Sequence, residues 1–216
     1  MNNILQCVQG SPEWLDARLS IPTSSCFSKI LTSKGVLSAS WFGYMNQLLA
    51  EYADPKYKGK RFNSKAMQRG IIMEPVARER YQALTKNIVT EVGGIFFDDN
   101  RDTMCSPDGL IYSKKRGWEV KCPDLDTHIG YFRKQVLPTK YILQVQAGLA
   151  FSDFLECGPF ESWDFQSFHP EYYDFIINVK RDEGLIKKIK ETILGFIVEL
   201  NKEKLIIDEY KASKEF

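Results

Sequence analysis

Two short segments of the chain place carboxylate and ammonium side chains at a spacing suited to cutting a phosphodiester. Asp108 stands in a Ser-Pro-Asp-Gly run, and Glu-Val-Lys follows after a gap of ten residues. In an extended strand Glu119 and Lys121 point to the same face, because side chains alternate. A hairpin over residues 109–118 would bring Asp108 beside that face. Carboxylate oxygens suit Mg²⁺ or Mn²⁺, so the pattern predicts metal-assisted attack on a phosphodiester.

Each of these residues also has an ordinary structural explanation. Pro-Asp-Gly is a strong turn signal by itself, and Lys121 has the alternative of a surface strand lysine. The combination favours Asp108 and Glu119 as metal ligands, with the Val120 carbonyl as a candidate third. Lys121 would deprotonate or orient the attacking water, or neutralise charge in the transition state. Nearby metal ions would lower its proton affinity and favour the base role, but the sequence leaves both roles open.

The bulk properties predict one globular domain over residues 1–216. The chain is 44% hydrophobic and 26% charged, with a net charge of +1, so any basic surface must be local. The sequence contains neither a signal peptide nor an apolar run of about 20 residues, which favours a cytoplasmic protein without membrane contact. The five cysteines form no Cys-x-x-Cys pair and are expected to be reduced. Two distant histidines predict no zinc site.

The hydrophobic periodicity predicts alternating groups of helices and strands. Helices are expected over residues 12–19, 39–52, 64–72, 138–151 and 182–205. Strands are expected over residues 95–98, 104–112, 117–121, 162–168 and 172–180. A proline disfavours helical geometry in the residue before it, so Pro75 is expected to kink a helix or to begin a new segment. This order predicts a mixed α/β fold, with helices flanking a central mixed sheet.

Five motifs in the first 150 residues resemble the lambda-exonuclease/YqaJ family of viral-type recombination nucleases, within the restriction-endonuclease-like superfamily. The motifs, in chain order, are Trp14-Leu15-x-x-Arg18 with Thr23-x-Ser25, Gly70-x-x-x-Glu74-Pro75-x-Ala77-Arg78-x-x-Tyr81, Cys105-Ser106-Pro107-Asp108-Gly109, Glu119-Val120-Lys121-Cys122-Pro123 and Tyr141-x-x-Gln144-Val145-Gln146. Each is short, and their shared order carries the resemblance. Residues beyond about 155 carry no matching motif.

The resemblance implies a metal-dependent exonuclease that degrades one strand of linear double-stranded DNA from its 5′ end. It also implies a restriction-endonuclease-like core, a homotrimer and a single-strand annealing protein as partner in recombination. The expected setting is a bacterial host cell, with the chain of phage or prophage origin. Strand polarity, processivity and the trimer follow from the resemblance alone.

Further site residues also come from the resemblance. Glu74 would complete the acidic cluster, although a carboxylate beside Pro75 also suits a helix start. Gln146 is placed in the site, contacting phosphate or its water network, with Tyr141 as its neighbour. Residues two apart on a helix do not share a face, so Gln144 is expected to be structural.

The family's pocket for a terminal 5′-phosphate is matched by Arg18, Ser25 and Ser106, and Tyr141 is assigned to the same function. A planar guanidinium with hydroxyl donors suits a phosphate dianion. The alternatives are that Arg18 is an ordinary surface residue and that Ser25 is an ordinary helix cap.

Two other functions remain open. One is a related nuclease of the superfamily with endonuclease activity or another end preference; its iron–sulfur members are disfavoured, because the cysteines are not clustered. The other is a non-catalytic clamp on DNA ends. A clamp does not need Asp108, Glu119 and Lys121 together, since carboxylates without metal repel phosphates, so the intact set favours an enzyme.

Overall fold

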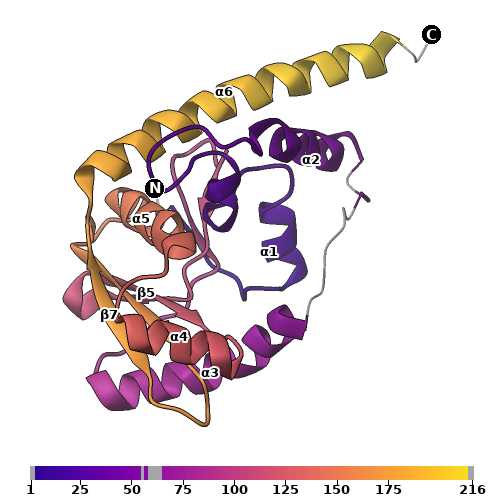
Figure 1. The fold of residues 1–216 in the computed structure, drawn as a ribbon. Coiled ribbons are helices and arrows are strands. Elements are labelled where there is room, and N and C mark those ends of the chain that lie inside the picture. Colours follow the sequence, from indigo (N-terminus) through magenta and orange to yellow (C-terminus); the bar gives the residue numbers. More distant parts are fainter. Residues whose placement is uncertain (1–2, 55, 58–64, 214–216) are drawn as a thin grey trace.

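The computed structural model describes residues 3–54, 56–57 and 65–213 and has the mixed α/β fold that the sequence predicts (Figure 1). The helices are α1 (Pro12–Ala17), α2 (Trp41–Ala53), α3 (Lys65–Thr85), α4 (Leu125–Lys134), α5 (Ile142–Phe151) and α6 (Glu183–Ser213). The strands are β1 (Ile4–Leu5), β2 (Gly94–Phe96), β3 (Met104–Cys105), β4 (Gly109–Ile111), β5 (Arg116–Lys121), β6 (Ser162–Ser167) and β7 (Phe175–Lys180). Short 3₁₀ helices are η1 (Ser24–Lys29), η2 (Tyr112–Lys114), η3 (Thr139–Tyr141) and η4 (Ser152–Phe154).

The strands form a three-stranded sheet, β1-β2-β3, and a four-stranded sheet, β4-β5-β6-β7. In the larger sheet β5 runs parallel to β6 and antiparallel to β4, with Gly109 opposite Trp118. The predicted hairpin over residues 109–118 is therefore confirmed. The single strand predicted over residues 104–112 is wrong, because residues 106–108 leave one sheet and enter the other. Pro107 lies at this crossing, where a residue without an N–H costs no ladder hydrogen bond.

Helices cover both faces of the larger sheet. Helix α3 packs on one face, where the Tyr81 ring contacts the Trp118 ring at a tilt, with 5.6 Å between ring centroids. Helix α5 packs on the other face, between the sheet and the outer helices α6 and α2 (Figure 1). Because side chains alternate along β5, Trp118 and Val120 join the core under α3, whereas Glu119 and Lys121 point toward α5.

Two glycines make room for the largest side chain between the sheet and α5. A Cβ atom on Gly117 of β5 would lie 2.2 Å from the Trp163 ring, and one on Gly148 of α5 would lie 2.6 Å from it. Both distances are shorter than any real carbon contact, so only glycine allows strand and helix to approach this ring. Trp118 and Trp163 are both fully buried in the core.

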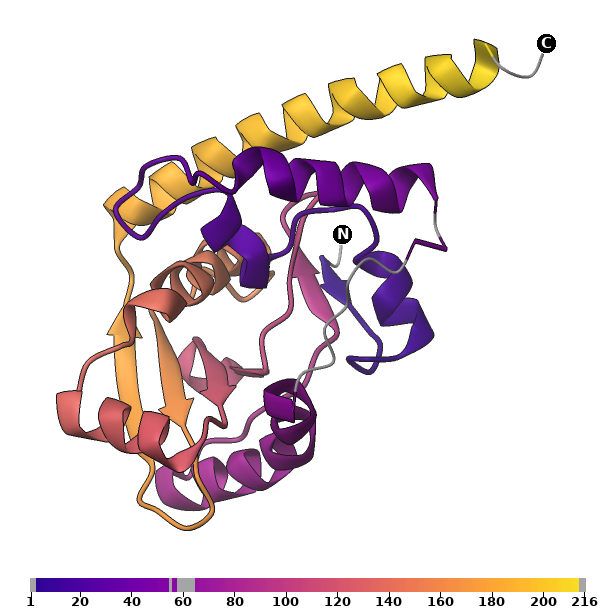
Figure 2. The same cartoon turned by 45° about the vertical axis from the view of Figure 1, so that its right-hand side comes forward.

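Helix α3 is longer than the sequence predicts. A helix over residues 64–72 was expected to be interrupted at Pro75, yet α3 continues to Thr85 with the proline inside it. The ribbon bends within the helix (Figure 2), as expected where a proline removes one helical hydrogen bond. Ala77 and Tyr81 are fully buried beyond the bend, and this packing outweighs the local cost. Helix α4 was not predicted at all; it buries His128 against the sheet.

Helix α6 lies along the outside of α5 and α2, and its last turns extend past the rest of the chain (Figures 1 and 2). Its buried stripe includes Leu185, Ile189 and Ile193, the periodicity that predicted a helix here, although the helix continues eight residues beyond the predicted end at 205. Among the described residues, no helix is long and apolar enough to cross a membrane.

Candidate active site

Strand β5 and the connection before β4 bring the predicted acidic cluster together. Glu119 is buried at 2% exposure, and the Lys121 ammonium donates to its carboxylate. The same Nζ atom lies 3.9 Å from Oδ2 of Asp108. The Val120 N–H donates to that Asp108 oxygen across 2.8 Å, which fixes the aspartate against β5. The convergence of Asp108, Glu119 and Lys121 on one point is thus as the alternation predicts.

The cluster holds more negative charge than its surroundings neutralise. Burial, reinforced by the neighbouring Asp108 carboxylate, raises the pKa of Glu119 to about 8. The same two causes, in the same order, raise the pKa of Glu74 on α3 to about 7. Glu74 also contributes to raising the pKa of Glu119. A cation placed among these carboxylates would therefore be strongly stabilised.

Lys121 is a firmly charged ammonium in this setting. Burial by itself lowers its pKa, but the carboxylates of Glu119 and Asp108 outweigh that effect, so the pKa of Lys121 is raised. The sequence-based expectation of a lowered proton affinity assumed neighbouring metal ions. With the side chains alone, the balance of charge favours an electrostatic role over a base.

The chemistry of this donor set fits a hard divalent cation. Asp108, Glu119 and Glu74 supply carboxylate oxygens, the donors that Mg²⁺ prefers. The raised pKa values of Glu74 and Glu119 are those of carboxylates that a nearby cation would stabilise. Within the described part of the chain, no three His, Cys, Asp or Glu side chains are arranged as a metal site. Lys121 contacts Glu119 directly, so the ammonium supplies part of the charge that a cation would bring. The Val120 carbonyl as a ligand stays a prediction.

Of the two glutamines of α5, Gln144 contacts the acidic cluster and Gln146 does not, which is the reverse of the prediction. The Gln144 amide donates to Oε1 of Glu119 across 2.6 Å. Gln146 is buried and faces away: its amide donates to the Lys180 carbonyl at 2.8 Å and accepts from the Asp182 N–H at 3.0 Å. The premise that the two cannot share a helix face holds, but the choice between them was wrong. The position of β5 relative to α5 decides which of the two glutamines reaches Glu119.

Tyr141 lies beside the acidic cluster. The Lys121 ammonium lies 5.6 Å from the centroid of the Tyr141 ring. The Lys140 ammonium lies 4.9 Å from the same centroid. The predicted position of Tyr141 beside the acidic cluster is matched by this place, and its assignment to the terminal-phosphate pocket stays a prediction.

A second polar group forms around Arg18 at the end of α1. One guanidinium nitrogen donates to the Ser106 hydroxyl at 2.9 Å, and the other donates to Thr23 at 3.3 Å and to Ser25 at 3.5 Å. The guanidinium also stacks over Trp14, 4.2 Å from the ring centroid. The predicted trio of Arg18, Ser25 and Ser106 is brought together. Sequence reasoning missed Thr23 as a member, although it stands in the quoted motif.

The two groups adjoin through the connection between the sheets. Ser106 contacts Arg18, and Asp108, two residues later, contacts β5. Two residues of extended chain span at most about 7 Å. An anion held by Arg18 would therefore lie next to the acidic cluster.

Comparison with known proteins identifies the family of the chain. Residues 13–154 match the YqaJ-like viral recombinase domain, and none of the curated proteins matches the sequence significantly. An alkaline exonuclease from Laribacter hongkongensis is similar in structure, with 31% identity and a TM-score of 0.78 over 94% of this chain and 99% of that one. Its complex with dAMP gives 30% identity and a TM-score of 0.79 over the same shares.

A phage-related exonuclease from Haemophilus somnus shares the fold, with 16% identity and a TM-score of 0.64 over 88% of this chain and 96% of that one. The family match spans most of the sequence and includes Arg18, Glu74, Asp108, Glu119 and Lys121. The chain belongs to the YqaJ-like viral recombinase domain family.

Proposed function

We propose that the chain is a Mg²⁺-dependent exonuclease that degrades one strand of linear double-stranded DNA in the 5′ to 3′ direction. The observation that carries the proposal is the junction of the Arg18 group and the acidic cluster through residues 106–108. A site that grips a terminal phosphate beside a site that cleaves phosphodiesters is what an exonuclease needs. The related alkaline exonuclease and its complex with dAMP support the same activity.

The residues divide the work as follows. Asp108, Glu119 and Glu74 would hold Mg²⁺, or Mn²⁺ in its place, and the bound metal supplies a polarised water and neutralises charge on the cleaved phosphate. Lys121, held as an ammonium, stabilises the additional negative charge of the transition state.

Around these residues, other side chains fix positions. Gln144 holds the Glu119 carboxylate in one orientation. Arg18, Ser25 and Ser106 bind the terminal phosphate, and the Trp14 ring fixes the guanidinium plane.

The biological setting follows from the family. A viral recombinase domain supports a role in recombination by single-strand annealing, with an annealing protein as partner. The motif resemblance supports a homotrimer, in a bacterial cytoplasm, with the chain encoded by a phage or prophage.

The test is digestion of linear duplex DNA labelled separately at its 5′ and 3′ ends. The substrates carry a 5′-phosphate or a 5′-hydroxyl, a closed circle serves as the endless control, and each is incubated with Mg²⁺ or EDTA. Mg²⁺-dependent release from 5′-phosphate ends, with the circle intact, is the expected result.

The other outcomes separate the alternatives. Cutting of the closed circle would replace the exonuclease with an endonuclease of the same superfamily. Tight binding to ends without cleavage under any divalent cation would favour a non-catalytic clamp. Release that begins at the 3′ label would refute the polarity.

A further inference from the structure

A buried glutamine on β6 joins helix α3 to strand β5. Gln166 is fully buried, and its side-chain oxygen accepts from the Trp118 indole N–H across 3.1 Å. Its side-chain nitrogen donates to the Ala77 carbonyl of α3 at 3.3 Å and to Oδ1 of Asp174 at 2.7 Å. An indole N–H only donates, whereas a carbonyl and a carboxylate only accept. Only one orientation of the amide therefore satisfies all three partners.

Both ends of this connection lie next to a carboxylate of the acidic cluster. Trp118 immediately precedes Glu119 on β5. Ala77 follows Glu74 by three residues on α3, and residues three apart share a helix face, about 4.5 Å apart along the axis. Gln166 thus connects the segment of α3 that carries Glu74 to the strand that carries Glu119.

The position of Glu74 depends on the path of α3. Its carboxylate makes no hydrogen bond or ion pair with another described residue. The next residue, Pro75, has no N–H to donate to the Ile71 carbonyl, so the helix lacks one backbone hydrogen bond beside Glu74. Figure 2 shows the bend of α3. Contacts from outside the helix are therefore needed to hold Glu74 in place.

The partners of Gln166 are themselves held in place. Oδ2 of Asp174 lies 2.7 Å from Nε of Arg80 on α3, while Oδ1 of the same carboxylate accepts from Gln166. One turn of α3 beyond Ala77, the Tyr81 hydroxyl donates to Asp164 of β6 at 2.5 Å. A side chain with three fixed partners has little freedom to move, so the distance that Gln166 spans is well defined.

The geometry points to Gln166 as a positioning residue that fixes Glu74 relative to Glu119 and thereby sets the affinity of the acidic cluster for a divalent cation. The two carboxylates already interact, since Glu74 contributes to raising the pKa of Glu119. Replacing a side chain that holds metal ligands in place commonly weakens metal binding about 10- to 100-fold. This inference rests on the proposed function, in which Asp108, Glu119 and Glu74 hold the cation.

The test is titration of the protein with Mn²⁺ by calorimetry, without DNA. Gln166→Met has a side chain of similar length and loses the hydrogen bonds of the amide. The matched control, Gln146→Met, also loses a buried amide, but one that binds the backbone at Lys180 and Asp182. Trp118→Phe removes the indole donor at the other end of the connection and provides a second variant. Urea unfolding establishes that each variant is folded.

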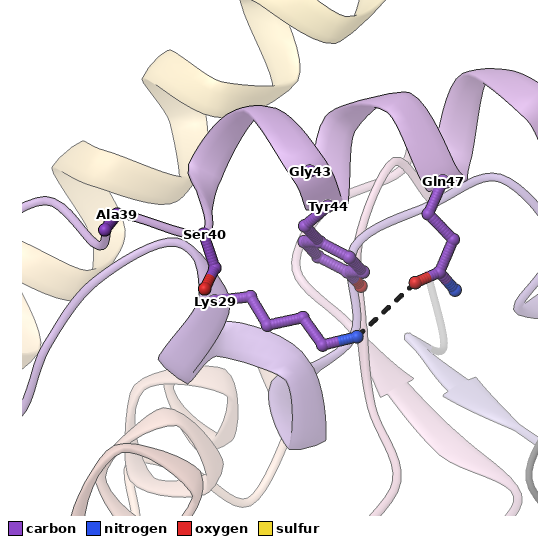
Figure 3. Close-up of a pocket in the computed structure, with 6 residues that line it drawn as sticks. All are labelled: Lys29, Ala39, Ser40, Gly43, Tyr44 and Gln47. Carbon is purple, nitrogen blue, oxygen red and sulfur yellow. Dashed lines mark hydrogen bonds between the residues drawn. The ribbon is translucent and has the colours of Figure 1, made fainter.

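Mn²⁺ is not expected to bind in the hollow between η1 and α2 (Figure 3). This hollow of about 300 Å³ is lined by Lys29, Ala39, Ser40, Gly43, Tyr44 and Gln47. Its charged group is the Lys29 ammonium, which repels a cation, and none of the six side chains is a carboxylate. Glu74→Gln removes one carboxylate from the acidic cluster and tests directly that the measured heat comes from that cluster.

Gln166→Met is expected to weaken Mn²⁺ binding about tenfold, and Trp118→Phe should weaken it in the same direction. Gln146→Met should bind Mn²⁺ like the wild type, although both glutamine variants lower the urea midpoint. In a Glu74→Gln background, Gln166→Met should cause no further loss, because the carboxylate that it positions is gone. In cleavage assays the Mg²⁺ concentration for half-maximal rate should rise about tenfold, while the rate at saturating Mg²⁺ recovers.

The other outcomes separate this inference from the proposed function. Wild-type Mn²⁺ affinity in Gln166→Met would overturn the inference and leave the exonuclease intact; if that variant does not fold, wild-type affinity in Trp118→Phe has the same meaning. An equal loss with and without Glu74, or an equal loss in Gln146→Met, would show a general effect on the fold and would also overturn it. A wild type that neither binds a divalent cation nor cleaves linear DNA would instead remove the proposed function, and this inference with it.

Discussion

The Gln144 amide donates to the Glu119 carboxylate across 2.6 Å, from a helix that packs over the face of the sheet from which this carboxylate projects. This contact joins α5 to the acidic cluster. It orients a buried carboxylate whose other close partner is Lys121. The cluster is therefore assembled from two layers of the fold, and the packing of α5 on β5 sets its geometry.

Gln144 contacts the acidic cluster whereas Gln146 holds the backbone around residues 180–182. Substitutions at the two positions should therefore have different effects on activity and on stability. Gln144→Ala should reduce kcat about tenfold or more with little change in stability, because one orienting hydrogen bond is lost. Gln146→Ala should lower the free energy of unfolding by about 1–3 kcal/mol, since the Lys180 carbonyl and the Asp182 N–H lose a buried partner. Urea unfolding and single-turnover cleavage measure the two effects. The reverse pattern would return Gln146 to the site.

Lys121 is expected to contribute to chemistry more than to DNA binding. Lys121→Met should lower kcat at least about 100-fold, the scale for loss of one preorganised charge in a site. Affinity for duplex in Ca²⁺ should stay within a few-fold. Lys121→Arg keeps the charge but changes its shape and should recover part of the rate. Undiminished turnover in Lys121→Met, measured on end-labelled DNA, would remove this residue from the mechanism.

Arg18 is expected to distinguish the state of the 5′ end. Arg18→Ala removes the guanidinium donors of the proposed phosphate pocket and should slow digestion of 5′-phosphorylated duplex about 10- to 100-fold. Digestion from a 5′-hydroxyl end, which offers Arg18 no terminal phosphate to bind, should hardly change. Trp14→Phe tests the stacking contact at 4.2 Å and should give a smaller effect of the same kind. Equal slowing on both ends would show that Arg18 does not bind the terminal phosphate.

His128 should make the fold sensitive to acid. Its Nε2 faces the Tyr173 carbonyl at 2.9 Å, so this nitrogen carries the proton, and its Nδ1 accepts from the Ser167 hydroxyl at 2.7 Å. Burial lowers the pKa of His128 below its ordinary 6.5. The unfolded chain therefore binds the proton first, and stability falls as the pH drops below about 6.5.

The measurement is the Tm of the wild type and of His128→Gln at pH 8, 6.5 and 5. Gln keeps a donor toward the Tyr173 carbonyl but does not titrate. The variant should be less stable at pH 8 yet lose less stability toward pH 5, by at most about 1.4 kcal/mol per pH unit, the limit for one proton. Parallel curves would show that His128 is not the acid-sensitive group.

Sequence patterns predicted the structural features that depend on residues close together in the chain. The alternation of Glu119 and Lys121, the turn at Asp108 and the amphipathic stripe of α6 are all readable because each reflects a period of two or 3.6. The continuation of helix α3 past Pro75 was not predicted. Burial of Tyr81 and Ala77 outweighs the cost of a proline inside the helix.

What the patterns could not supply was the relation between distant segments. The choice of Gln144 over Gln146, the division of residues 104–112 between two sheets and the contact of Thr23 with Arg18 all depend on how elements pack. The approach of α5 to β5, for example, is set by Gly148 and Gly117 around Trp163. No spacing within one element encodes such a distance.

The short crossing from the smaller to the larger sheet has a consequence for the size of the product. Ser106 is tied to Arg18 and Asp108 to β5, and each end of the crossing is fixed in a different sheet, so their separation cannot adjust to the substrate. The distance between the Arg18 group and the acidic cluster is therefore the same for every substrate. On the proposed roles of Arg18 and Asp108, we expect the number of nucleotides removed in each step to be set by residues 106–108 and to be independent of the DNA sequence.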